Sequence, residues 1–187
     1  PPRSTLFPYT TLFRSELVDM EPTGPHEAVS GKVAARLILA IAQANHPWLI
    51  PRTCLIQPEL STATARRPDV IVLDETELSE EPLWQRQSII SSAKSIKLVV
   101  EVVSTNWEND YARKVEEYAN FGIPEYWIVD FRGLGGTAFI GRPKQPTFIV
   151  ATLDGYDYNQ VQYRLGQPSQ SPLFPELSLQ LDDLMPR

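Results

Sequence analysis

A glutamate lies inside a run of apolar residues that is typical of a buried strand. Glu101 interrupts the sequence LVVEVVS, between Val100 and Val102. A second carboxylate, Asp69, opens another apolar run directly after Pro68, in RRPDVIVLD. Burying a carboxylate costs several kcal/mol unless a charged partner meets it. Two carboxylates from adjacent strands can hold a magnesium ion, which lowers the pKa of a bound water and offsets charge on a phosphate. This chemistry indicates phosphodiester hydrolysis.

A lysine follows at a spacing that fits the same chemistry. Lys114 and Asp110 are four residues apart in WENDYARK and would share one face of a helix. This helix begins soon after the strand that contains Glu101, and the long stem of Lys114 can reach back toward that strand. A lysine placed there can orient an attacking water or neutralise charge developing on a phosphate. We therefore expect Glu101 to meet a divalent metal and the Lys114 ammonium.

Each of these residues also has a structural interpretation. Glu101 could form a buried salt bridge with Lys97 or with an arginine, and Asp69 could only cap a turn. Asp110 could simply pair with Lys114, or favour the start of its helix through its charge. The residue types and spacings leave these alternatives open.

Hydrophobic periodicity predicts the elements that would position these side chains. A helix is expected over about residues 26–45, because apolar residues recur three and four positions apart. Residues 96–131 are typical of a strand, a helix and a second strand, with the helix over 107–121 and Gly122 as its C-terminal stop. Residues 48–60 form a strand region at the sheet edge, interpreted as a hairpin.

The C-terminal third favours antiparallel strands. The segments FIG, PTFIVATL and YNQVQYRL are separated by turn residues, and the tail SPLFPELSLQLDDLM is interpreted as a short strand and a final turn. The predicted fold class is α/β (α+β), with a central mixed β-sheet flanked by helices and a C-terminal antiparallel extension.

Composition narrows the class of protein. The 187 residues, 42% of them hydrophobic, fit one globular domain, and no run reaches the roughly 18 apolar residues of a transmembrane helix. Cys54 is the only cysteine, which excludes a disulfide framework and a cysteine-based zinc cluster and favours a reducing, cytoplasmic setting. The net charge of −6 argues against loose electrostatic binding to nucleic acid, but leaves a local basic patch or a charge-compensating metal open.

The first residues differ in origin from the rest. The peptide TLFPYTTLFRS lacks the features of a signal peptide and matches one reading frame of a common sequencing adapter. We therefore expect residues 1–15 to be a leader foreign to the fold, and residues 16–187 to form a single domain.

Several motifs together resemble the Uma-two family, which belongs to the PD-(D/E)XK nuclease superfamily. The resemblance runs from about residue 26 to the final LDDLM and implies a restriction-endonuclease-like fold and a metal-dependent endonuclease whose partner is DNA. The motifs are Pro68-Asp69, Glu101-Val102-Val103-Ser104, Asp110 with Lys114, Tyr118, and GIPEYWIVD at residues 122–130.

The resemblance also implies roles for single residues. Asp69 and Glu101 would bind the metal, which is Mg²⁺ with Mn²⁺ as a substitute, and the carbonyl oxygen of Val102 would add a ligand. The superfamily places a lysine two residues after the acid, where this chain has Val103. In this family the lysine comes from the following helix, and Lys114 is the candidate.

Two further acids are candidates for accessory roles in this interpretation. Glu27 occupies the early-helix place of an accessory acid, and Asp110 is a second accessory candidate.

The missing strand lysine and the acidic balance favour, as an alternative, a catalytically silent nuclease-fold protein that binds DNA or a protein partner. A structural protein with Glu101 in a buried ion pair is the third class. A homodimer would share positive surface, but no interface can be read from the sequence.

Overall fold

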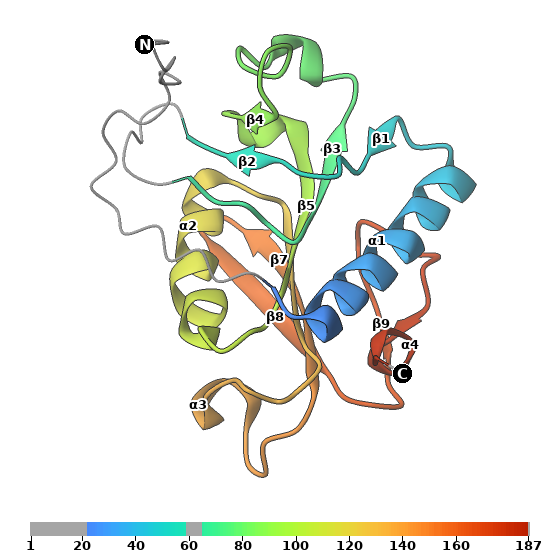
Figure 1. Cartoon of the computed structure of the whole chain (residues 1–187), viewed down its shortest axis with the longest axis vertical. Helices are drawn as coiled ribbons and strands as arrows, with labels where there is room; N and C mark the ends of the chain where they lie inside the picture. Colours follow the sequence, from blue (N-terminus) through green and yellow to red (C-terminus); the bar gives the residue numbers. More distant parts are fainter. Residues whose placement is uncertain (1–21, 59–64, 187) are drawn as a thin grey trace, which may run out of the picture.

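The computed structural model describes residues 22–58 and 65–186, so the expected leader at residues 1–15 lies outside the described residues (Figure 1). A six-stranded sheet in the order β1-β3-β5-β6-β7-β8 forms its centre. The strands are β1 (Trp48–Leu49), β3 (Val70–Asp74), β5 (Ile96–Val102), β6 (Glu125–Asp130), β7 (Thr147–Asp154) and β8 (Asp157–Tyr163).

Two small strand pairs and several helices complete the described residues. The strand pairs are β2 (Leu55–Ile56) with β4 (Ile89–Ile90), and β9 (Pro168–Ser169) with β10 (Leu179–Gln180). The α-helices are α1 (Gly24–Ala44), α2 (Lys114–Phe121), α3 (Thr137–Ile140) and α4 (Leu181–Leu184). The other helical turns are η1 (Leu78–Glu80), η2 (Ala93–Ser95) and η3 (Asn109–Arg113). None of the helices in the described ranges is both long and apolar enough to cross a membrane.

The sheet is mixed, as predicted. β5 and β6 are parallel and are joined through α2, which confirms the expected unit of strand, helix and strand. All other neighbours in the sheet are antiparallel, including the C-terminal extension of β7 and β8. Val70 of β3 pairs with Val100 of β5, so Asp69, one residue earlier, lies level with Glu101. The sheet therefore brings the two predicted carboxylates onto adjacent strands.

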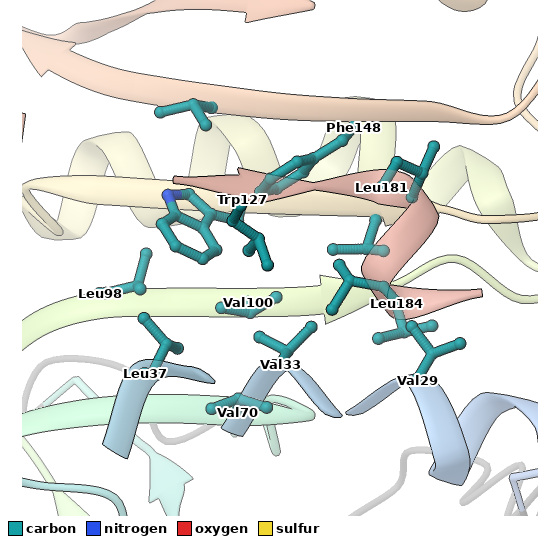
Figure 2. Close-up of a cluster of buried hydrophobic side chains, with 14 of the residues drawn as sticks. Val29, Val33, Leu37, Val70, Leu98, Val100, Trp127, Phe148, Leu181 and Leu184 are labelled. Atoms are coloured by element: carbon teal, nitrogen blue, oxygen red, sulfur yellow. The ribbon is translucent and has the colours of Figure 1, made fainter. Parts of the chain in front are cut away.

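One face of the sheet is covered by α1 and α4 (Figure 1). The buried stripe of α1 follows the predicted helical period, with Pro25 at the start of the helix and Asn45 in the left-handed conformation at its end. Figure 2 shows this stripe packed on side chains from the sheet and from α4. The labelled members are Val29, Val33, Leu37, Val70, Leu98, Val100, Trp127, Phe148, Leu181 and Leu184.

The opposite face of the sheet packs against α2. Val99 and Val103 lie in the same buried cluster as Tyr118 of α2 and Tyr126 of β6. Glu101 is two residues from each of these valines, so strand alternation directs its side chain toward this face as well. Gly122 ends α2 with a φ of 92°, a conformation that favours glycine, as predicted from the sequence.

The helix over residues 107–121 is less regular than predicted. Its central part, η3, is a π-helix, and regular α-helix resumes at Lys114. Single π-turns inserted in α-helices recur at functional sites. Here the wide turn contains Asp110 and Tyr111, and both are buried.

Two strand predictions were wrong. The FIG segment lies at the end of α3 instead of in a strand, because a short apolar run fits either structure. A Cβ atom on Gly136 would lie 2.6 Å from the Trp107 ring, so this segment approaches the α2 region too closely for a side chain there. The expected hairpin in residues 48–60 is also absent from the described residues, since β1 pairs with β3 and β2 pairs with β4.

Packing of α1 on the sheet yields a direct test. Leu37→Ala removes a side chain that is 0% exposed, and we expect it to lower the free energy of unfolding by about 2–5 kcal/mol. Leu39→Ala, in the same helix, is the matched control because Leu39 is 57% exposed, and its effect should stay within about 0.5 kcal/mol. Urea denaturation followed by circular dichroism measures both. Equal losses in the two variants would contradict this packing.

Candidate functional site

Glu101 meets both a cation and a hydroxyl group. The residue is 2% exposed, and its Oε2 lies 2.9 Å from the Lys114 ammonium. Tyr118 donates a hydrogen bond of 2.7 Å to Oε1. Lys97, the structural alternative, instead lies 2.9 Å from Asp74. The predicted contact between Glu101 and Lys114 is therefore present.

Lys114 is shared between two carboxylates. Its ammonium donates a hydrogen bond of 2.7 Å to Oδ1 of Asp110, four residues earlier, in addition to its contact with Glu101. Tyr126 donates to the backbone carbonyl of Asp110 at 3.0 Å, which anchors the π-turn to β6. Asp110 is itself buried. The ammonium thus lies between a strand carboxylate and a helix carboxylate.

Asp69 has a backbone partner at the end of β5. Its Oδ2 accepts a hydrogen bond of 2.7 Å from the Val102 N–H, just beyond the point where β3 stops pairing with β5. His26 of α1 donates from Nε2 to the Val102 carbonyl at 2.9 Å and lies 3.4 Å from Asp69 Oδ2. Together the two side chains provide hydrogen-bond partners for the part of the β5 edge with which β3 does not pair. The carbonyl predicted as a metal ligand therefore accepts a protein hydrogen bond in this structure.

Glu27 lies at the margin of this arrangement. Its side chain is 61% exposed, and its only described ionic neighbour is His26, 3.7 Å away. The structure thus brings Asp69, Glu101, Asp110 and Lys114 together, while Glu27 is near them only through His26.

Sequence reasoning assigned no role to two side chains that hold this site. Tyr118 was part of the resemblance, but its hydroxyl contact with Glu101 depends on how α2 lies on the sheet. His26 reaches Val102 across 76 positions of the chain, and nothing in its local sequence indicates that partner.

The charges of the site do not balance. Three carboxylates, on Asp69, Glu101 and Asp110, face one lysine. Burial, reinforced by the charges of Asp69 and Asp110, raises the pKa of Glu101 to about 7 although Lys114 acts in the opposite direction. Burial also raises the pKa of Asp110. Burial alone would lower the pKa of Lys114, but the two carboxylates outweigh it and raise that pKa, so the ammonium stays charged.

This excess of negative charge fits a divalent cation. Carboxylate oxygens are the ligands that Mg²⁺ prefers, and Mg²⁺ is usually held by one or two carboxylates with water and substrate phosphate. Asp69 and Glu101 supply such a pair from adjacent strands. In residues 22–58 and 65–186, no group of three or more His, Cys, Asp or Glu side chains could hold a metal by itself. The described residues therefore form no closed structural metal site, and an ion held by Asp69 and Glu101 would have to complete its coordination with water or phosphate.

Ionisation of Glu101 should make the stability of the metal-free protein depend on pH. The carboxyl has a pKa near 4.5 when unfolded and about 7 when folded, so the folded state binds more protons in this range. Its contribution is complete below pH 4.5 and is lost as the pH rises through 7. We expect it to be on the order of 3 kcal/mol, measured as the free energy of unfolding in the presence of a chelator. Glu101→Gln should remove this part of the slope.

Asp74→Asn is the matched control for this experiment. Asp74 is also a carboxylate paired with a lysine, but hydrogen bonds from Thr76 and Lys97 outweigh its burial and lower its pKa. Its stabilisation is therefore lost only as the pH falls below the range tested. The pKa of His26 is raised by its hydrogen bond to Asp69, which adds a slope of the same sign as Glu101. The readout is thus the difference between Glu101→Gln and wild type, and identical slopes would contradict the raised pKa of Glu101.

Comparison with known proteins identifies a family. No curated protein matches the chain. A family model described as "Putative restriction endonuclease", Uma2, matches residues 9–182, which is nearly the whole chain. This match agrees with the mixed sheet flanked by helices. The chain therefore belongs to the Uma2 family of restriction-endonuclease type.

Proposed function

We propose that the protein is a metal-dependent endonuclease that hydrolyses phosphodiester bonds in DNA. The observation that carries the proposal is the charged Lys114 ammonium held between Glu101 and Asp110, beside Asp69 on the adjacent strand. A family of restriction-endonuclease type supports nuclease chemistry on DNA. The ion that fits the site is Mg²⁺, with Mn²⁺ as a substitute.

The side chains of the site would have different roles in this reaction. Asp69 and Glu101 would hold the ion, which supplies an activated water and offsets phosphate charge. Lys114 stays protonated, so it is suited to orient the water or to stabilise negative charge on the phosphate, and unsuited to act as a base. Asp110 positions Lys114, and Tyr118 positions Glu101. In this scheme Lys114 performs from a helix what a strand lysine at the position of Val103 would otherwise do.

A second candidate function has its own support in the contacts of the site. Both carboxylate oxygens of Glu101 have protein partners, and the Val102 carbonyl accepts from His26. A cation would have to share these oxygens with Tyr118 and Lys114. This arrangement favours, as the alternative, a protein of the same fold that binds DNA without cleaving it.

Plasmid cleavage separates the two candidates. Supercoiled plasmid is incubated with the protein in Mg²⁺, in Mn²⁺ or in chelator, and nicked and linear products are measured. We expect metal-dependent cleavage that falls by about 100-fold or more in Glu101→Ala and in Lys114→Ala, since each removes charge stabilisation at the reacting phosphate. Lys97→Ala is the matched control, because Lys97 also lies on β5 and pairs with a carboxylate outside the site.

Different outcomes of this experiment test the carboxylate site and the role of Lys114. Cleavage that survives Lys114→Ala would contradict the role of Lys114 and leave the carboxylates in place. DNA binding by the wild type without cleavage in either metal would establish the silent alternative. Circular dichroism verifies that each variant is folded, and Lys114→Gln, which removes the charge but keeps a long polar side chain, replaces Lys114→Ala where the alanine variant is not folded.

A further inference from the structure

Two arginines from separate parts of the chain share one carboxylate beside the candidate site. Arg66 makes a bidentate contact with Glu117, from Nε to Oε2 at 2.7 Å and from Nη2 to Oε1 at 2.8 Å. Arg113 donates from Nε to the same Oε1 at 2.8 Å. We call these three residues the arginine clamp. Their geometry holds two guanidinium groups next to each other at the surface of α2.

The arginine clamp adjoins the carboxylates and the lysine along the chain. Arg66 comes three residues before Asp69, in the segment that leads into β3 and passes across α2 (Figure 1). Arg113 directly precedes Lys114. Glu117 directly precedes Tyr118, whose hydroxyl holds Glu101. Lys114 and Glu117 are three residues apart on α2, so they are neighbours on the surface of that helix.

The arginine clamp has positive charge and hydrogen-bond donors that Glu117 does not satisfy. One carboxylate compensates only one of the two guanidinium charges, which leaves a net charge of about +1. Contacts with Glu117 use two donor groups of Arg66 and one of Arg113, and the described residues provide no other hydrogen-bond partner for either guanidinium. The Arg113 side chain is 58% exposed. Arg66 and Glu117 both line a cavity of about 270 Å³.

We propose that Arg66 and Arg113, oriented by Glu117, bind a backbone phosphate of duplex DNA next to the phosphate that is cleaved. Guanidinium groups match phosphate oxygens in shape and charge, and they bind most strongly when their orientation is already set. Glu117 sets it here by contacting both side chains. This inference rests on the proposed function and adds a substrate-binding site to it.

The alternative is a structural role, in which the contact between Arg66 and Glu117 only fixes the segment before β3 to α2. Both interpretations predict lower stability when the contact is removed. Only phosphate binding predicts a change in the salt dependence of DNA affinity, because each phosphate contact releases counterions.

Affinity for a labelled DNA duplex, measured by fluorescence anisotropy at several salt concentrations, tests the proposal. Chelator is present, so that cleavage does not interfere. We expect Arg66→Gln and Arg113→Gln each to reduce the slope of log affinity against log salt by about 0.9, which is about a fivefold loss of affinity near 0.15 M salt. Arg36→Gln is the matched control, since Arg36 is a half-exposed arginine on α1 paired with Asp183. Its slope should equal that of the wild type.

Glu117→Gln gives a readout of opposite sign. It removes the negative charge of the clamp and keeps both arginines, together with an amide oxygen that can still accept a hydrogen bond from one of them, so the salt slope should be maintained or become steeper. A purely structural contact predicts instead that Glu117→Gln and Arg66→Gln impair the protein alike. Thermal unfolding followed by circular dichroism identifies any variant that is not folded, and Arg113→Gln, at the most exposed member, then carries the test.

Cleavage by the same proteins distinguishes failure of the clamp from failure of the nuclease. If the wild type cleaves DNA and both arginine variants keep the wild-type salt slope, the clamp is wrong and the nuclease stands. If the wild type binds DNA without cleaving it and the slopes fall as expected, the clamp stands and the nuclease assignment falls. If the wild type does not bind duplex DNA at any salt concentration, the clamp is wrong, and plasmid cleavage alone decides the nuclease assignment.

Discussion

The Lys114 ammonium between Glu101 and Asp110 is the interaction on which the site depends. A buried carboxylate at position 101 could not be retained in the middle of β5 without a charged partner, and α2 delivers that partner from above the sheet. The π-turn around Asp110 allows the helix to present Asp110 and Lys114 together while Tyr126 anchors its backbone. The packing of α2 on the sheet therefore also supplies the charge that the buried Glu101 needs.

The second constraint is the place where β3 ends. Beyond Val70 the edge of β5 has no strand beside it, so the Val102 N–H and carbonyl need other partners. Asp69 and His26 supply them, one from the segment before β3 and one from the first turn of α1. The site thus forms where a strand stops, because polar side chains must take over there from the backbone ladder.

Charge is distributed unevenly around this point. The three carboxylates leave the interior of the site negative, which suits a divalent cation. On α2, Glu117 contacts two arginines, so these three residues together keep one unbalanced positive charge. An acidic protein can attract a polyanion only through such local fields, since its net charge repels it at long range. The structure places the local positive charge a few residues along the chain from Asp69 and Lys114.

The sequence by itself determined the elements whose signals are local. Helical spacing in α1, the stop at Gly122, the mixed sheet, and the alternation that directs Glu101 toward α2 were all predictable, and from them the contact between Glu101 and Lys114. Local signals failed at FIG, where a short apolar run fits helix and strand equally, and at the π-turn, which leaves no periodic trace. Tertiary structure alone decided the contacts of His26 with Val102, of Tyr118 with Glu101 and of Arg66 with Glu117. The physical reason is that periodicity specifies which face of an element is buried, whereas a hydrogen bond between distant segments also requires the position and rotation of both segments, and the packing of the whole core sets these.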